Sequence, residues 1–190
     1  MVPKPLKSHY KNLVVSGCSF TTDEHVPTGP PWNWASTLCA DTGMTIHNLA
    51  AGAAGNTHIS RSIILYLELN NLDPADTLIM AMWSGVGRID WTVSHDAIQQ
   101  RYNYNYTPQC KSLKFGNWWN IRGNNPVTPY AKLQNNHTFA LESWLSMTSL
   151  STYLDCKGYK YFYTSFVDYK NKQIKGDALT VPLDDVLKEM

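Results

Sequence analysis

The sequence predicts an α/β domain built on a parallel β-sheet. Short apolar, β-leaning runs alternate three times with longer segments of helical spacing between residues 13 and 90, the pattern of strands joined by helices. Residues 77–83 are almost wholly apolar, which is typical of a central parallel strand covered on both faces. The chain has 190 residues, enough for one domain with a core but not comfortably for two. We therefore expect one domain over residues 1–190.

The apolar periodicity also predicts where each element lies. Strands are expected at residues 13–16, 45–50, 77–83 and 159–167. Helices are expected at 32–41, 57–70 and 139–154, with opening turns of another at 182–190. Asn56 stands where the second helix should be capped. The inward residues expected on the second and third helices are Ile59, Ile63, Ile64 and Leu67, and Leu141, Trp144, Leu145, Leu150 and Leu154.

Charge and cysteine content exclude several classes of function. The formal net charge is +1, from 16 basic and 15 acidic residues, so we expect neither nucleic acid nor an anionic membrane as a partner. No apolar run has the length of a membrane span or a signal peptide, which predicts synthesis in the cytoplasm and leaves open release within a particle. The cysteines lack the pair spacing of a zinc site, and we expect no metal or cofactor; they are Cys18, Cys39, Cys110 and Cys156.

Residues 91–136 interrupt the alternation with a polar, aromatic-rich insertion. Irregular segments of this length are usually functional or disordered, and this one is too aromatic for comfortable disorder. Aromatic faces beside amides suit sugar rings, so Tyr104, Trp118 and Trp119 are candidate substrate-binding residues. The alternatives are a half-buried β-hairpin, a lid or a subunit contact with the tryptophans packed inside.

The stretch from Leu13 to Thr21 carries the candidate nucleophile. Four apolar residues lead into a small-residue turn that holds Ser19. In an open α/β sheet such a turn lies at the carboxyl end of a strand, where ligands bind. An ordinary turn serine is the alternative interpretation.

Four segments, in the right order, resemble the SGNH hydrolase superfamily, also called GDSL-type esterases, and especially its phage-borne branch. Residues 16–21 (Ser-Gly-Cys-Ser-Phe-Thr) resemble the first block, and residues 48–52 (Asn-Leu-Ala-Ala-Gly) resemble the second. Residues 82–88 (Met-Trp-Ser-Gly-Val-Gly-Arg) resemble the third. The long helix before residues 158–162 resembles the segment preceding the last block.

This resemblance implies a flavodoxin-like three-layer α/β/α sandwich, with the strands in the spatial order second, first, third, fourth. It implies hydrolysis of a small ester or an acylated glycan, with Ser19 as the nucleophile. The backbone N–H groups of Ser19 and Gly52 would form the oxyanion hole, with Ser84 as a further candidate. We expect Ser19, Gly52 and Ser84 to converge at one sheet edge, with Ser19 Oγ within about 8 Å of the Gly52 amide.

Departures from the family pattern are equally informative. Cys18 replaces the usual aspartate, and residues 85–88 lack the usual side-chain oxyanion donor. No aspartate in the chain is followed by histidine three residues later, so the resemblance supplies neither the base nor its carboxylate. His25 and His58, on loops near the first two blocks, are the alternatives considered and are more typical of exposed loop residues. The chain is therefore expected to be a weak or inactive esterase, and the alternative is a degenerate binding or structural component of a phage particle.

Overall fold

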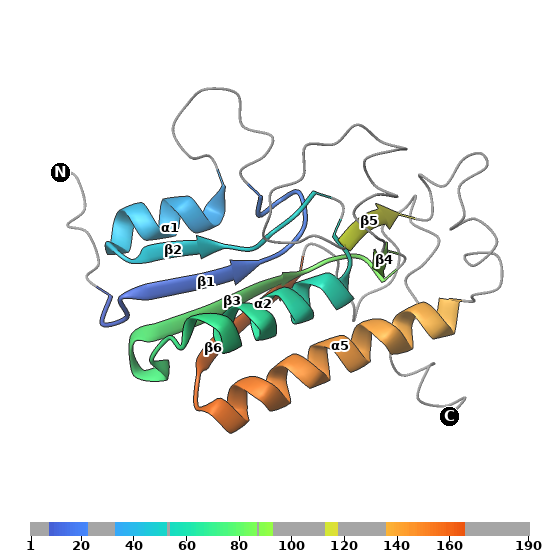
Figure 1. The fold of residues 1–190 in the computed structure, drawn as a ribbon. Coiled ribbons are helices and arrows are strands. Elements are labelled where there is room, and N and C mark those ends of the chain that lie inside the picture. The colour runs from blue at the N-terminus through green and yellow to red at the C-terminus, as the bar shows by residue number, and fades with distance from the viewer. Residues whose placement is uncertain are drawn as a thin grey trace.

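A computed structural model describes residues 8–22, 33–52, 54–86, 88–92, 113–117 and 136–165. Four parallel strands form its main sheet, in the order β2-β1-β3-β6 (Figure 1). They are β1 (Asn12–Ser16), β2 (Thr45–Asn48), β3 (Thr77–Trp83) and β6 (Lys160–Ser165). Both the strands and their spatial order confirm the sequence prediction, and the order is that of flavodoxin-like sheets.

Helices cover both faces of this sheet, which gives the three layers. Helices α2 (Asn56–Asn70) and α5 (Asn136–Lys157) lie on one face, and α1 (Trp34–Thr42) lies on the other (Figure 1). Alternate residues of β1 point to opposite faces. Val14 accordingly joins the α2–α5 core, and Leu13 and Val15 join the α1 core.

The predicted stripe of α2 is confirmed, whereas that of α5 is partly wrong. Ile59, Ile63 and Leu67 are buried, and Ile64 packs against the same core. On α5, Leu150 and Leu154 are fully buried, but Leu145 is 49% exposed. The inward row of α5 instead runs through Ser143, Met147, Leu150 and Leu154. These positions follow the helical repeat, and the small, buried Ser143 hides this row from a reading based on hydrophobicity alone.

Helix α1 begins and ends as its sequence directs. The Asn33 side chain accepts a hydrogen bond from Ser36 N at 2.8 Å, capping the helix. Gly43 then adopts φ 76°, a left-handed conformation that suits glycine, and its N–H bonds Cys39 O at 2.8 Å.

The prediction that Asn56 caps helix α2 is wrong. Gly55, not Asn56, is the N-cap residue of this helix, and it offers no side-chain cap. Asn56 is the first helical residue, and its side chain bonds the end of β3 instead. A buried strand end competes for the amide more effectively than the helix does, because the Ser84 backbone would otherwise be buried without this partner.

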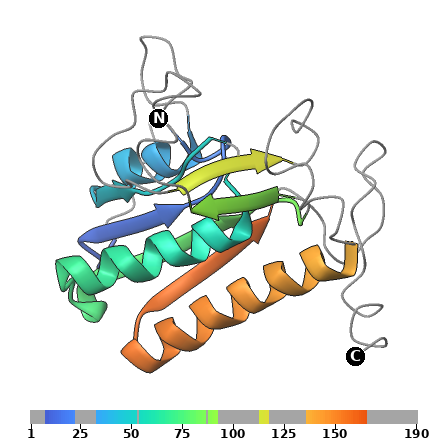
Figure 2. The ribbon, with the colours of Figure 1, turned by 45° about the vertical axis from the view of Figure 1, so that its right-hand side comes forward.

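A two-stranded antiparallel hairpin follows β3. It pairs β4 (Arg88–Thr92) with β5 (Leu113–Asn117). Figure 2 shows the two strands side by side, next to the end of α2 at which that helix begins. Strand β5 lies within the aromatic segment 91–136, whereas β4 enters it only with residues 91–92. The hairpin expected from the alternation of Tyr and Asn at 102–106 lies outside the described residues. The helix expected at 182–190 lies outside the described residues, as do Tyr104, Trp118 and Trp119.

Candidate functional site at the carboxyl edge of the sheet

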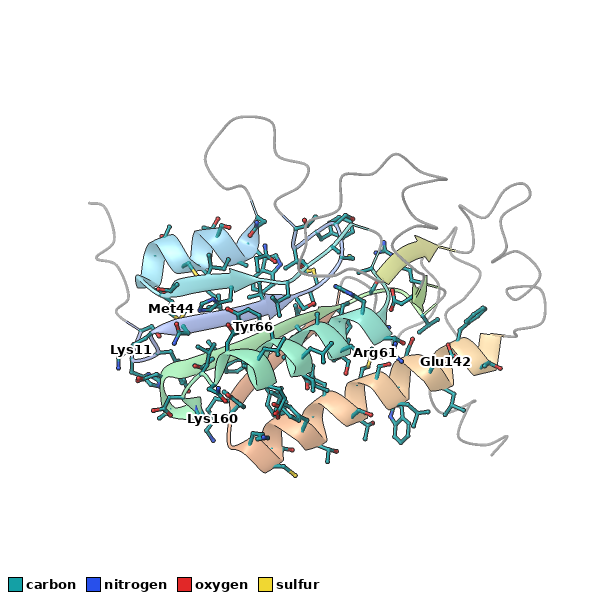
Figure 3. The ribbon with its side chains drawn as sticks, in the orientation of Figure 1. Lys11, Met44, Arg61, Tyr66, Glu142 and Lys160 are labelled. Atoms are coloured by element: carbon teal, nitrogen blue, oxygen red, sulfur yellow. The ribbon has the colours of Figure 1, made fainter. Side chains whose placement is uncertain are left out.

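Three predicted site residues follow the carboxyl ends of three parallel strands. Ser19 follows β1, Gly52 follows β2 and Ser84 follows β3. The strands all run in one direction, toward the right in Figure 1, so their loops leave from the same edge. In Figure 3, Lys11 and Lys160 mark the opposite edge, where strands begin.

Ser19 lies in a tight turn whose geometry depends on glycine. Both Thr21 N and Thr22 N donate to Cys18 O, at 2.9 and 3.1 Å, so Ser19 and Phe20 are the central residues. A Cβ on Gly17 would lie 2.8 Å from Thr21 Cβ, and Thr21 is fully buried. Ser19 is half-buried in this turn and Phe20 is exposed.

The loop with Gly52 runs beside the loop with Ser19. Leu49 N donates to Val15 O at 2.8 Å, and Ala51 N donates to Gly17 O at 3.2 Å. The Asn48 side chain adds a bond to Thr21 O at 2.8 Å. These bonds extend the pairing of β1 with β2 past the ends of the strands, so residues 16–21 and 48–52 form one local structure. The predicted distance from Ser19 Oγ to the Gly52 amide stays a prediction.

Ser84 is buried at this edge, and its backbone is bonded to Asn56. Ser84 N donates to Asn56 Oδ1 at 2.7 Å, and Asn56 Nδ2 donates to Ser84 O at 3.0 Å. The Ser84 N–H and the Asn56 amide are therefore used within the protein. The oxyanion-hole roles expected for the N–H groups of Ser19 and Gly52 and for Ser84 stay predictions.

Asp90 caps helix α2 from strand β4, an arrangement that sequence reasoning missed. Its Oδ1 accepts from Gly55 N at 2.7 Å and its Oδ2 accepts from His58 N at 2.6 Å. A carboxylate is favourable here because the first N–H groups of a helix lack partners within the helix and carry partial positive charge. The contact joins residues more than thirty positions apart, so no local spacing rule could have found it.

Burial shifts the pKa values of two side chains at this helix end, the Asp90 carboxyl and the His58 imidazole. It raises the pKa of Asp90 to about 6, although the bonds from Gly55 and His58 and the charges of Arg61 and Arg88 oppose the shift. Figure 3 shows Arg61 on α2. Burial also lowers the pKa of the His58 imidazole to about 4, against the bond with Leu49, so His58 is neutral at physiological pH.

The described histidine rings do not match a catalytic base. His58 is 3% exposed within α2, and its Nε2 lies 3.2 Å from Leu49 O, which corrects the expectation of an exposed loop residue. His47 bonds Asn12 Oδ1 through Nε2 at 3.1 Å and Tyr66 OH through Nδ1 at 2.8 Å. His9 precedes β1 and lies toward the opposite edge. His25 lies outside the described residues.

Neither a metal site nor a membrane span is found in the part of the chain that the structure describes. No group of three or more histidine, cysteine, aspartate or glutamate side chains there could hold a metal ion. None of the helices in the same part is long and apolar enough to cross a membrane.

Comparisons with known proteins do not extend this description. No protein-family model matches the chain, and no curated protein matches it either.

Proposed function

We propose that this protein is an SGNH-type hydrolase that cleaves ester bonds, with Ser19 as its nucleophile. The observation that carries the proposal is the pairing of the Ser19 and Gly52 loops through Ala51 N and Gly17 O, 3.2 Å apart. This pairing brings the loop of a partly exposed serine beside the loop of a candidate oxyanion donor at a sheet edge where ligands typically bind.

The chemistry follows from these groups. Ser19 Oγ attacks the ester carbonyl carbon, and the carbonyl oxygen becomes an oxyanion that the N–H groups of Ser19 and Gly52 stabilise. One such donor typically lowers the barrier by about 3 kcal/mol. A base must take the hydroxyl proton and return it to the leaving alcohol, and water then releases the acyl group. No residue of the chain is assigned as this base; His25, six positions after Ser19 in the sequence, is the first to test.

Acylated glycans are the proposed substrates. The support is the composition of the insertion, where Tyr104, Trp118 and Trp119 stand among asparagines. Flat aromatic faces stack on sugar rings and side-chain amides bond sugar hydroxyls. The β4–β5 hairpin, whose strand β4 leads into this insertion, contacts the start of α2 through Asp90. This contact lies at the start of α2, just after the Gly52 loop at the same sheet edge.

Hydrolysis of an aryl acetate by the purified chain tests the proposal. Ser19→Ala should abolish turnover above the uncatalysed rate. Ser149→Ala, which removes an exposed hydroxyl on α5, should not change it. Acetyl release from an acetylated oligosaccharide, with and without Trp118→Ala, then tests the substrate class. Turnover that survives Ser19→Ala would overturn the assignment of the nucleophile.

A second candidate function is a binding or assembly module of a phage particle that keeps the fold without catalysis. It is favoured by the absence of an Asp-x-x-His sequence and by the engagement of His47 and His58 within the fold. Equal, near-background rates for the wild type and Ser19→Ala would support it over the hydrolase.

A further inference from the structure

The loop from Ala51 to Gly55 is fixed at both of its ends, and Gly52 lies between them. At one end Ala51 N bonds Gly17 O at 3.2 Å, and a turn follows in which Ala54 N bonds Ala51 O at 3.1 Å. At the other end Gly55 N bonds the Asp90 carboxylate at 2.7 Å. The conformation of the Gly52 loop therefore depends on a side chain from another element.

The packing at this contact leaves room for the Asp90 carboxylate but not for a side chain at position 55. A Cβ on Gly55 would lie 2.8 Å from Asp90 Oδ2 and 2.8 Å from Arg88 O. Only glycine lets strand β4 approach the start of α2 this closely. Arg88 Nη1 donates to Ala54 O at 3.2 Å, which adds a third bond between β4 and residues 54–58.

The opposite side of the helix start is held independently. Asn56 bonds the backbone of Ser84 twice, at 2.7 and 3.0 Å. Loss of Asp90 would therefore free the Gly55 end of the loop, while Arg88 would keep its bond to Ala54 and Asn56 would keep α2 attached to β3. This separation makes a local effect measurable.

We propose that Asp90 is a positioning residue, which caps α2 from the hairpin and thereby holds the Gly52 amide in place at the sheet edge. The inference rests on the proposed function for the role of Gly52 in binding the oxyanion. The hairpin and the Gly52 loop then behave as one unit.

Hydrogen exchange followed by NMR tests the structural half of this proposal. Asp90→Ala should lower the protection of the Gly55 and His58 amides about tenfold, since loss of a helix cap costs on this scale. Asp90→Asn keeps one acceptor oxygen and should restore part of it. The control is Asp73→Ala, because Asp73 caps a 3-10 turn (Pro74–Asp76) before β3 by accepting from Ala75 N at 2.9 Å. Asp73→Ala should leave the protection of the Gly55 and His58 amides unchanged.

Gly55→Ala provides a second route if Asp90→Ala does not fold. Its methyl group displaces the carboxylate from the other side and should lower the same protection. Unchanged protection of Gly55 and His58 in Asp90→Ala would overturn the proposal. A uniform fall that includes the amides of β1 would also overturn it, because that pattern reports global destabilisation.

Kinetics tests the catalytic half. With a hydrolysed ester, Asp90→Ala should lower kcat while KM changes little, since an oxyanion donor acts mainly in the transition state. Asp90→Asn should recover part of kcat. Lost amide protection with an unchanged kcat would overturn positioning as the role of Asp90. If the wild type hydrolyses no ester, the proposed function fails, whereas the exchange experiment still decides whether Asp90 holds the loop.

Discussion

Asn56 and Ser84 join the start of helix α2 to the end of strand β3 through two hydrogen bonds. The Asn56 side chain accepts from Ser84 N at 2.7 Å and donates to Ser84 O at 3.0 Å. Both residues are buried. A side-chain amide can satisfy a backbone N–H and C=O together because it carries one donor group and one acceptor. This contact joins the helix that follows residues 48–52 to residues 82–88, although the two segments are far apart in the sequence.

Replacing Asn56 with alanine should therefore be costly. We expect Asn56→Ala to lower the free energy of unfolding by about 2–4 kcal/mol, because two buried backbone groups of Ser84 lose this partner. Asn70→Ala is the matched control, since the Asn70 side chain bonds Tyr66 O at an exposed position of the same helix; it should cost less than about 1 kcal/mol. Urea unfolding measures both, and equal effects would contradict a special role for the buried pair.

The turn that holds Ser19 should not tolerate a methyl group on Gly17. The added Cβ would lie 2.8 Å from Thr21 Cβ and 3.3 Å from Met82 Cβ. Thr21 cannot easily move, because it is fully buried and Trp34 Nε1 donates to its hydroxyl at 3.2 Å. We expect Gly17→Ala to destabilise the protein by about 1–3 kcal/mol and to shift the indole N–H resonance of Trp34.

Gly43→Ala separates backbone strain from this steric effect. Gly43 has φ 76°, and a Cβ added to it would meet no atom within 4 Å. This variant should cost about 1 kcal/mol, the usual penalty for a left-handed non-glycine residue, and leave the Trp34 resonance in place. A shift of that resonance in Gly43→Ala would show that it reports general loosening rather than the Ser19 turn.

His58 and Asp90 should give opposite contributions to stability in acid. Burial lowers the pKa of His58 from 6.5 to about 4, so its contribution is present above pH 6.5 and is lost as the pH falls toward 4. This is on the order of 3 kcal/mol. Burial raises the pKa of Asp90 from 3.8 to about 6. Its contribution is therefore present below pH 3.8 and is lost as the pH rises through 6.

Two variants separate these contributions when unfolding is measured at pH 7.5 and pH 4.5. His58→Gln keeps a donor for Leu49 O but cannot titrate, so it should lose less stability on acidification than the wild type. Asp90→Asn should lose more, because it removes the opposing group. Identical acid losses in the wild type and His58→Gln would contradict the burial of a neutral imidazole.

Ester hydrolysis by the chain should be slow, and His58 should not supply the base. Loss of one member of a serine triad typically leaves a rate about 10³–10⁴-fold above that in water, and residues 85–88 lack the usual side-chain oxyanion donor of the family pattern. Steady-state rates with a short-chain aryl acetate should therefore fall near or below this level. His58→Gln should leave kcat unchanged, since His58 Nε2 lies against Leu49 O. A large fall in kcat with an intact fold would contradict this.

The sequence by itself determined the layers of this fold. Strands such as β3 and the Ile59, Ile63, Leu67 row of α2 have a periodicity that follows from burial alone. The edge at which Ser19, Gly52 and Ser84 lie follows from the same pattern, because parallel strands end on one side of a sheet. The prediction that Leu145 points inward is wrong, because hydrophobicity alone does not reveal that the small Ser143 occupies the inward row.

Only the tertiary structure decided how the polar groups are paired. Asn56 has the residue type and position of a helix cap, yet its amide bonds Ser84, and Asp90 takes over the cap from a different strand. His58 resembles an exposed loop residue in sequence but is buried. Hydrogen-bond partners are chosen by distance in space, and a buried polar group takes whichever partner the packing brings to it. Local sequence carries little information on that choice.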